Sequence, residues 1–204
     1  MPCVTLEEPE NLGSLSKRTG RVANLSWDEL ATFLASLPDE DRARFAYYAA
    51  IDLPADAEGI STVLSSYAAE NPAATPSALL ATTGTQAGTS GDLVLARTLG
   101  RAALNLAEEL GDLQLAHVSL AQTHFQNRRD ETDLIAFVQH CQAAIKAGHA
   151  GSFCYERLAV LYEHRGEKKE AAEICCRAIE VLEAAGDHRS ATRFRKRLDR
   201  LSQK

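Results

Sequence analysis

The chain has 204 residues, of which 45% are hydrophobic and 25% are charged, and its formal net charge is −6 at pH 7. These proportions are those of an ordinary globular protein, and the negative charge argues against nucleic acid as the main partner. No apolar run approaches the roughly 18 residues that a membrane-spanning helix needs, and the N-terminus begins no signal sequence. An odd number of cysteines without regular spacing indicates a reducing compartment. We therefore predict a cytoplasmic protein that binds no membrane.

The N-terminal part divides into a polar arm and a helical region. Residues 1–24 are polar and are interrupted by proline and glycine, so we expect a flexible N-terminal arm. In the helical region, 25–72, Ser26 and Glu29 have the spacing of a capping box. Apolar residues at helical spacing predict three helices there, near 26–37, 39–52 and 55–70. Periodicity leaves open whether this region is a separate domain or extends an array of repeats.

A pattern of small and apolar residues then recurs three times. A Leu-Ala pair and a later small residue mark each copy, at Leu80-Ala81 and Ala103, at Leu120-Ala121 and Ala144, and at Leu158-Ala159 and Ala178. The pattern predicts a pair of helices in each copy, near 76–87 and 91–110, near 113–127 and 132–147, and near 152–165 and 168–185. Gly111, Gly148 and Gly186 follow as predicted helix ends. The stretch 82–91 is either the end of a helix with an extended turn or a flexible linker.

The third copy resembles a tetratricopeptide repeat. That family has W-x2-L-G-x2-Y in its first helix and A-x3-F in its second. This chain has Tyr155-x2-Leu158-Ala159-x2-Tyr162, followed by Ala171-x3-Cys175-x2-Ala178. Tyr stands in place of Trp, Ala in place of Gly and Cys in place of Phe. The resemblance implies an all-α protein: a right-handed superhelical array of helix-turn-helix repeats at 76–111, 112–148 and 151–187, with an N-terminal helical extension.

A strongly basic helix is predicted at the C-terminus, over 188–204. Residues 189–204 hold seven basic side chains and one acidic one. Phe194, Leu198 and Leu201 share one side, as a capping helix of a repeat array requires. We interpret the basic side chains as the solvated outer face of this helix. The alternative is a patch for nucleic acid or for an acidic partner.

Motifs of enzyme chemistry are missing from the sequence. It contains no phosphate loop, HExxH, CxxC pair or GxSxG elbow, so we predict no enzyme activity, no catalytic or metal-binding residues and no cofactor. A metal cluster of His117, His124 and His140 is conceivable, but the first two occupy aromatic positions of the repeat, which favours a structural role. Cys141 and Cys175 fall at small core positions of the repeat.

The resemblance implies a protein-interaction module that binds a peptide or a partner helix on the concave face. The family's inward positions correspond to Thr82, Thr85 and Gln86 in copy one, to Gln122, Phe125 and Gln126 in copy two, and to Glu156, Val160, Glu163 and His164 in copy three. Phe125 is the predicted central anchor of this site unless it is buried between copies. The two glutamates favour a basic ligand. The Lys, Arg and Asn residues of the family's carboxylate-clamp variant do not occur at these positions.

The alternative function is a regulatory or sensor domain. Repeats with long second helices are also similar to those of bacterial peptide-sensing transcription regulators. However, the predicted turns of the 25–72 region contain Pro38 and Pro54, and its helices have few basic residues, so a helix-turn-helix that reads DNA is not indicated. The partner's identity, the pathway and the oligomeric state are not specified by the sequence.

Overall fold

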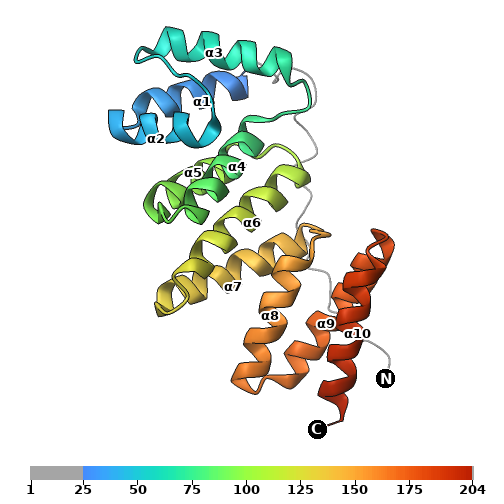
Figure 1. The fold of residues 1–204 in the computed structure, drawn as a ribbon. Coiled ribbons are helices and arrows are strands. Elements are labelled where there is room, and N and C mark those ends of the chain that lie inside the picture. Colours follow the sequence, from blue (N-terminus) through green and yellow to red (C-terminus); the bar gives the residue numbers. More distant parts are fainter. Residues whose placement is uncertain (1–24, 204) are drawn as a thin grey trace. The chain divides into compact units, whose positions relative to one another are not determined.

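The computed structural model describes residues 25–203 and folds them into α-helices, with no strand in that part of the chain (Figure 1). The predicted all-α class is confirmed. The predicted N-terminal arm and Lys204 lie outside the described residues, as does the side chain of Ser26. The helices are α1 (Leu25–Ser36), α2 (Asp39–Ala49), α3 (Ala57–Glu70), α4 (Pro76–Thr89), α5 (Leu93–Asn105), α6 (Leu110–Gln126), α7 (Glu131–Lys146), α8 (Ser152–Arg165), α9 (Lys168–Ala184) and α10 (His188–Ser202).

The helix ends lie within three residues of those predicted, except that α5 ends at Asn105 and not near residue 110. Gly111 is the second residue of α6 and does not end a helix, so that prediction is wrong. The reason is a side-chain contact: the hydroxyl of Thr75 donates to Oδ1 of the buried Asp112 at 2.6 Å. Thr75 also caps α4, since its oxygen accepts from the backbone N–H of Ala78. One threonine therefore joins the start of α4 to the first turn of α6.

Glycines with positive φ follow four of the described helices, and the first is Gly91 after α4, with φ of 91°. Gly148, Gly166 and Gly186 follow α7, α8 and α9 with φ of 87°, 77° and 79°. In this left-handed region glycine lacks the steric penalty of a Cβ atom. The helix ends predicted at Gly148 and Gly186 are confirmed. The uncertain stretch at 82–91 belongs to α4 as far as Thr89, which excludes a linker over those residues.

The described residues fall into two compact units, one of residues 25–140 and the other of residues 141–203. The boundary falls within α7, so this helix contributes its first ten residues to one unit and the rest to the other. Each unit has a core of its own.

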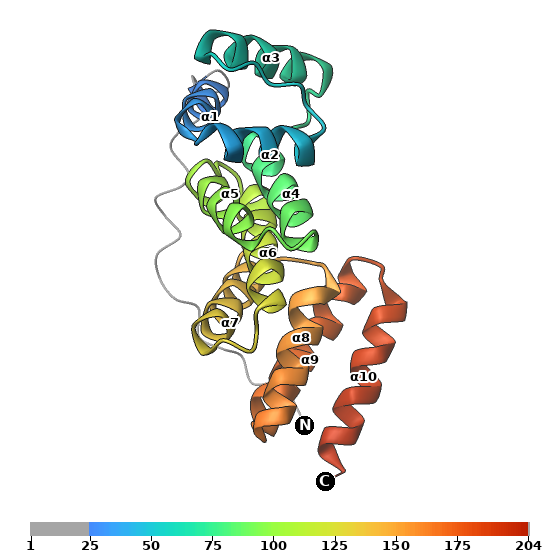
Figure 2. The ribbon, with the colours of Figure 1, turned by 60° about the vertical axis from the view of Figure 1, so that its left-hand side comes forward.

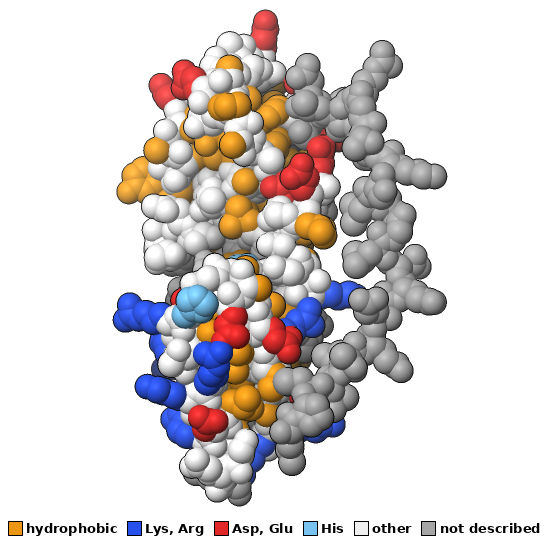
Figure 3. Space-filling view, turned by 90° about the vertical axis from the view of Figure 1, so that its right-hand side faces the viewer, with side chains coloured by type: hydrophobic (Ala, Val, Ile, Leu, Met, Phe, Trp, Pro, Cys, Tyr) orange, Lys and Arg blue, Asp and Glu red, His pale blue; other side chains and the backbone are white. Residues whose placement is uncertain are grey.

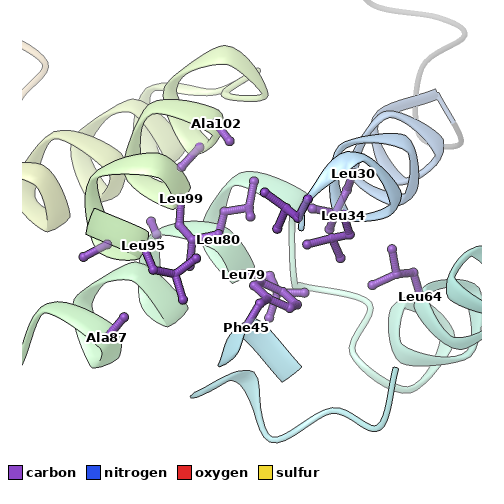
Figure 4. Close-up of a cluster of buried hydrophobic side chains, with 14 of the residues drawn as sticks. Leu30, Leu34, Phe45, Leu64, Leu79, Leu80, Ala87, Leu95, Leu99 and Ala102 are labelled. Atoms are coloured by element: carbon purple, nitrogen blue, oxygen red, sulfur yellow. The ribbon is translucent and has the colours of Figure 1, made fainter. Parts of the chain in front are cut away.

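The core of the 25–140 unit lies around α4, which packs against α5, α6 and α2. Figure 4 shows Leu80, Leu95 and Leu99 facing one another between α4 and α5, and Phe45 of α2 beside Leu79. These side chains are buried. Helix α1 adds further leucines to the same cluster and also packs against α3. The N-terminal helical region and the first predicted repeat thus share one hydrophobic core.

Small residues let the helices of this unit approach closely. A Cβ atom built on Gly100 would lie 2.6 Å from Cδ2 of Leu120, so the two helices touch at a glycine. The hydroxyl of Ser119 donates to the carbonyl oxygen of Ala81 at 2.8 Å, and that of Ser77 donates to Ala103 at 2.9 Å. Both hydroxyl groups are buried and hydrogen-bonded, as polar groups in a core must be.

In the 141–203 unit, α9 packs against α8 and α10 (Figures 1 and 2). Its buried side chains are Cys141, Ala144, Ile145, Cys154, Tyr155, Leu158, Ala159, Tyr162, Ala171, Cys175, Ala178, Leu182, Ala191 and Phe194. The hydroxyl groups of the two tyrosines have partners: Tyr155 donates to the carbonyl oxygen of His149 at 3.0 Å, and Tyr162 accepts from Gln142 at 3.1 Å.

The positions that define the three predicted copies are buried, with His117 half-buried as the exception. They are Ser77, Leu80, Ala81, Gly84, Ala96, Gly100 and Ala103 in copy one; Leu120, Ala121, His124, Phe137, Cys141 and Ala144 in copy two; and Tyr155, Leu158, Ala159, Tyr162, Ala171, Cys175 and Ala178 in copy three. The sequence pattern therefore identified the buried face of α4 through α9. None of the described helices is long and apolar enough to cross a membrane.

Two glycine substitutions test the close packing of α5 on α6. Gly100→Ala places a methyl group against Leu120, so we expect a loss of about 1–3 kcal/mol in the free energy of unfolding through overpacking. The matched control is Gly111→Ala, where a Cβ would meet nothing within 4 Å. Alanine favours helix over glycine, so this control should gain about 0.5 kcal/mol. Denaturant titration measures both values, and a Gly100→Ala variant as stable as the wild type would contradict the close contact.

Candidate functional site

The copy-three positions of the predicted concave face lie on α8. Glu156, Val160 and Glu163 are half-buried, and His164 is exposed near the C-terminal end of the helix. Tyr155, Leu158 and Tyr162 of the same helix are buried. Helix α8 thus presents its large aromatic and aliphatic side chains to the core and its two glutamates at the edge of that core.

Both glutamates form ion pairs with α10. Oε1 of Glu156 lies 3.4 Å from a guanidinium nitrogen of Arg193, and Oε1 of Glu163 lies 2.8 Å from one of Arg197. In the Glu156–Arg193 pair the arginine side chain is 65% exposed, whereas in the Glu163–Arg197 pair it is only 19% exposed. The carboxylates that were predicted to favour a basic ligand are therefore already paired within the chain.

An open hollow of about 530 Å³ lies between α8 and α10. It is lined by Ser152, Glu156, Ser190, Arg193, Phe194, Lys196, Arg197, Asp199 and Arg200. A second hollow of about 460 Å³ has Arg200 in common with the first and adds Glu163, Lys168, Leu201 and Gln203. We call the two hollows together the α8–α10 groove.

The groove combines an apolar floor with charged walls. Phe194 is only 4% exposed, so its ring belongs to the core and leaves an edge at the floor of the first hollow. Four basic side chains and two acidic ones surround that floor. Figure 3 shows Lys and Arg side chains beside Asp and Glu side chains in the lower part of the view, with hydrophobic atoms between them. The first hollow therefore carries a surplus of positive charge.

Local sequence explains why α10 supplies these bases. Asp187 caps the helix, since its side chain accepts from the backbone N–H of Ser190 at 3.0 Å. Arg193, Arg197 and Arg200 follow at spacings of four and three residues, which place them on one side of a helix. The sequence favoured a solvated outer face for these bases, with a patch for nucleic acid or for an acidic partner as the alternative, and in the structure they border the groove. Their helical spacing, directly beside the Phe194 stripe, is the signal that identifies them.

The copy-two positions lie on α6, in the other unit. Gln122 is half-buried and Gln126 is exposed. Phe125 is half-buried; its ring centroid lies 5.1 Å from that of the buried Phe137, and the guanidinium of Arg128 lies 4.5 Å from its centroid. Phe125 is therefore held by neighbours within its own unit while part of its ring remains accessible.

The copy-one positions belong to α4. The hydroxyls of Thr82 and Thr85 donate to the carbonyl oxygens of Ala78 and Ala81, one turn earlier, at 2.8 and 3.0 Å. Such bonds satisfy the hydroxyl groups within the helix. Gln86 is exposed.

A polar cluster joins α5, α6 and α7 in the 25–140 unit. Asp133 is its centre: Arg97 lies 2.8 Å from both carboxylate oxygens, and Nδ1 of His124 lies 2.6 Å from Oδ1. Asn127 donates to Oδ2 as well. Burial acts to raise the pKa of Asp133, but the hydrogen bonds from His124 and Asn127 and the charge of Arg97 together lower it below its usual value. The carboxylate is therefore ionised and ties three helices together.

The remaining histidines extend this cluster. Nδ1 of His117 lies 3.0 Å from Nδ1 of His140, and the His140 ring stacks on that of His124 with an interplanar angle of 14°. Since one Nδ1 must accept the hydrogen bond, at least one of these rings is neutral. Burial, and then the positive charges of His117, His124 and Arg101, lower the pKa of His140 to about 4.

No group of three or more His, Cys, Asp or Glu side chains with metal-binding geometry occurs among residues 25–203. In the three-histidine set considered from the sequence, Nδ1 of His124 faces Asp133 and the nearest nitrogens of the other two face each other. Cys141 and Cys175 are buried, as predicted for core positions, and burial raises the pKa of both thiols, to about 12 for Cys175.

Comparisons with known proteins give no relative for this chain: no protein-family model, no curated protein and no solved structure matches it. The functional conclusion therefore depends on the chain's own geometry.

Phe125 and Phe137 provide a graded test of how Phe125 is held. Phe137 is fully buried, so Phe137→Ala should cost about 3–5 kcal/mol of unfolding free energy. Phe125 is only half-buried, so Phe125→Ala should cost about 1–2 kcal/mol of unfolding free energy, less than Phe137→Ala. Chemical denaturation of the two variants measures the difference. Equal losses would place Phe125 in the core and remove it as a binding residue.

The histidine cluster predicts a pH dependence of stability. The pKa of His140 is about 4 in the folded protein and near 6.5 when unfolded, so the unfolded chain takes up the proton first as the pH falls. The free energy of unfolding should therefore decrease between pH 6.5 and about 4, and His140→Gln should make that decrease smaller. The stabilisation from Asp133 is lost only at still lower pH, because the folded protein lowers the pKa of this carboxyl group.

The control for this pH experiment is His164→Gln, which removes an exposed histidine. Denaturant titrations at a series of pH values should give wild-type pH dependence for the control. If His140→Gln retains the full wild-type slope, the neutral, buried state of His140 is contradicted.

Proposed function

We propose that this chain is a protein-interaction module of the tetratricopeptide-like type, which binds a peptide segment or a partner helix in the α8–α10 groove. In this proposal α4–α5, α6–α7 and α8–α9 are the three helix pairs of a right-handed superhelical array. Helix α10 closes the array, and α1–α3 extend it. The observation that carries the proposal is the open groove between the first helix of the last pair and the closing helix.

The groove has the properties of a binding site for an extended or helical segment. Each of its two hollows falls within the roughly 300–1,000 Å³ that is usual for ligand pockets. Phe194 supplies an apolar floor, and charged side chains border it on both helices. Burial of the repeat positions in α8 and α9 supports a rigid helix pair beneath the groove. A rigid wall limits the ordering cost of binding.

The described N-terminal helices favour this function over a DNA-linked sensor. Arg42 and Arg44 are the basic residues of α1–α3. Arg42 pairs with Asp39, and Arg44 pairs with Asp41 and Asp92. DNA-binding helices direct arginine and lysine side chains at phosphates and bases. Arginines that are engaged by neighbouring carboxylates support a structural role for α1–α3.

A groove-filling variant tests the function. Peptides are selected from a random-sequence display library on the immobilised full chain. We expect enrichment on the wild type and its loss with Ser190→Trp, because Ser190 lines the first hollow and an indole fills that space. The matched control is Thr192→Trp, an exposed position of α10 outside the lining, which should enrich the same peptides. Enrichment of no peptide, or equal enrichment on Ser190→Trp, would refute the proposal.

A further inference from the structure

We infer that the α8–α10 groove is specific for acidic peptide segments, whose carboxylates take the place of Glu156 and Glu163 as partners of Arg193 and Arg197. The inference rests on the proposed function and specifies the chemistry of its ligand. It reverses the preference that the two glutamates suggest when the sequence is considered alone.

The first argument is the distribution of charge. The whole chain has a net charge of −6, yet the first hollow is lined by four basic side chains, Arg193, Lys196, Arg197 and Arg200, against Glu156 and Asp199. A basic groove on an acidic protein attracts acidic segments and repels basic ones. The local surplus of positive charge therefore favours a negatively charged ligand, although the chain as a whole is negatively charged.

The second argument is that two of the four bases of the first hollow form no ion pair within the described part of the chain. Lys196 and Arg200 are exposed and form no ion pair with any acidic side chain of residues 25–203. Both line the groove, and Arg200 borders both hollows. By contrast, Arg195 lies on the same helix outside the groove and is paired with Glu183 of α9. Two of the unpaired bases of α10 therefore lie in the groove, and a third, Arg189, lies outside it.

The third argument is that the Glu156–Arg193 ion pair is exchangeable. The Glu156–Arg193 pair has a separation of 3.4 Å and an arginine that is 65% exposed, so it is a weak surface pair. An incoming carboxylate replaces one such pair with another of the same kind, and it adds new pairs with Lys196 and Arg200. A planar guanidinium can also donate two parallel hydrogen bonds to one carboxylate. The internal pairs each show a single contact and do not use this bidentate arrangement.

The lining favours an acidic peptide over a nucleic acid. Glu156 and Asp199 stand among the bases and would repel a continuous phosphate backbone. A peptide places its carboxylates at intervals, and it offers apolar side chains for the Phe194 floor between them. The fitting ligand therefore alternates acidic and apolar residues.

The experiment uses a fluorescein-labelled peptide that repeats Glu-Glu-Leu, with binding to the full chain followed by fluorescence anisotropy. The double variant Lys196→Gln/Arg200→Gln should weaken binding by about tenfold or more, since it removes the two unpaired bases of the first hollow. The matched control, Arg189→Gln/Arg195→Gln, removes the same charge from the same helix outside the groove and should retain most of the affinity. Circular dichroism melting verifies that each variant is folded.

A second pair of variants tests the exchange directly. Glu156→Gln/Glu163→Gln removes the internal competitors and should tighten binding of the acidic peptide by several fold. Glu170→Gln/Glu180→Gln, two exposed positions of α9, gives the same change of net charge and should have little effect. A basic ligand would give the opposite sign, because the glutamates would then be its partners.

Three results would overturn the inference: no binding of the Glu-Glu-Leu peptide, preferential binding of a Lys-Lys-Leu peptide, or tighter binding of single-stranded oligothymidylate with the same dependence on Lys196 and Arg200. These results are distinguishable from a failure of the proposed function. If the display library yields neutral or basic peptides that Ser190→Trp rejects, the groove is a binding site but its ligand is not acidic. If the library yields nothing, both conclusions fail.

Discussion

The structure depends on helices that approach each other at small residues. Gly100 leaves room for Leu120, and Ala159, Ala171 and Ala178 are fully buried in the α8–α9 pair. With so little side chain between the helices, stability comes from many close contacts rather than from one large core. The buried serine hydroxyls, which bond to backbone carbonyls of neighbouring helices, fix the same short distances. The helices α4, α5 and α6, and likewise α8 and α9, are therefore closely packed, and charged side chains lie at their outer edges.

Those charged edges differ between the two units. In the 25–140 unit the central carboxylate, Asp133, is 10% exposed and has partners on three sides, so its ion pairs act as fixed structural links. In the 141–203 unit both pairs between α8 and α10 stand beside a groove, and the Glu156–Arg193 pair is the more accessible of the two. Burial and multiple partners make the Asp133 contacts hard to exchange, and solvent makes the Glu156–Arg193 pair easier to exchange. The same residue types thus form buried links in one unit and an accessible ion pair in the other.

Sequence reasoning predicted most of the helices and the buried positions because both depend on local spacing. It failed at Gly111, where the contact between Thr75 and Asp112 moved the start of α6. It also missed the groove, because the partners of α10 lie 34 and 37 residues earlier on α8. Helical spacing shows which side chains share a face, but it does not show what stands opposite that face. The sequence therefore predicted Glu156 and Glu163 as site residues but did not predict that Arg193 and Arg197 pair with them.

If the proposed function holds, the internal pairs also set a threshold for ligand binding. Glu156 and Glu163 are held near their arginines by the fold, so a single external carboxylate competes against a partner of high local concentration. A segment with several carboxylates overcomes this competition, because each further contact forms within the same complex and Lys196 and Arg200 require no displacement. A groove lined by bases alone would instead accept any small anion. On the proposed function, the two glutamates therefore weaken the binding of a single carboxylate at Arg193 and Arg197 and favour segments that carry acidic residues in series.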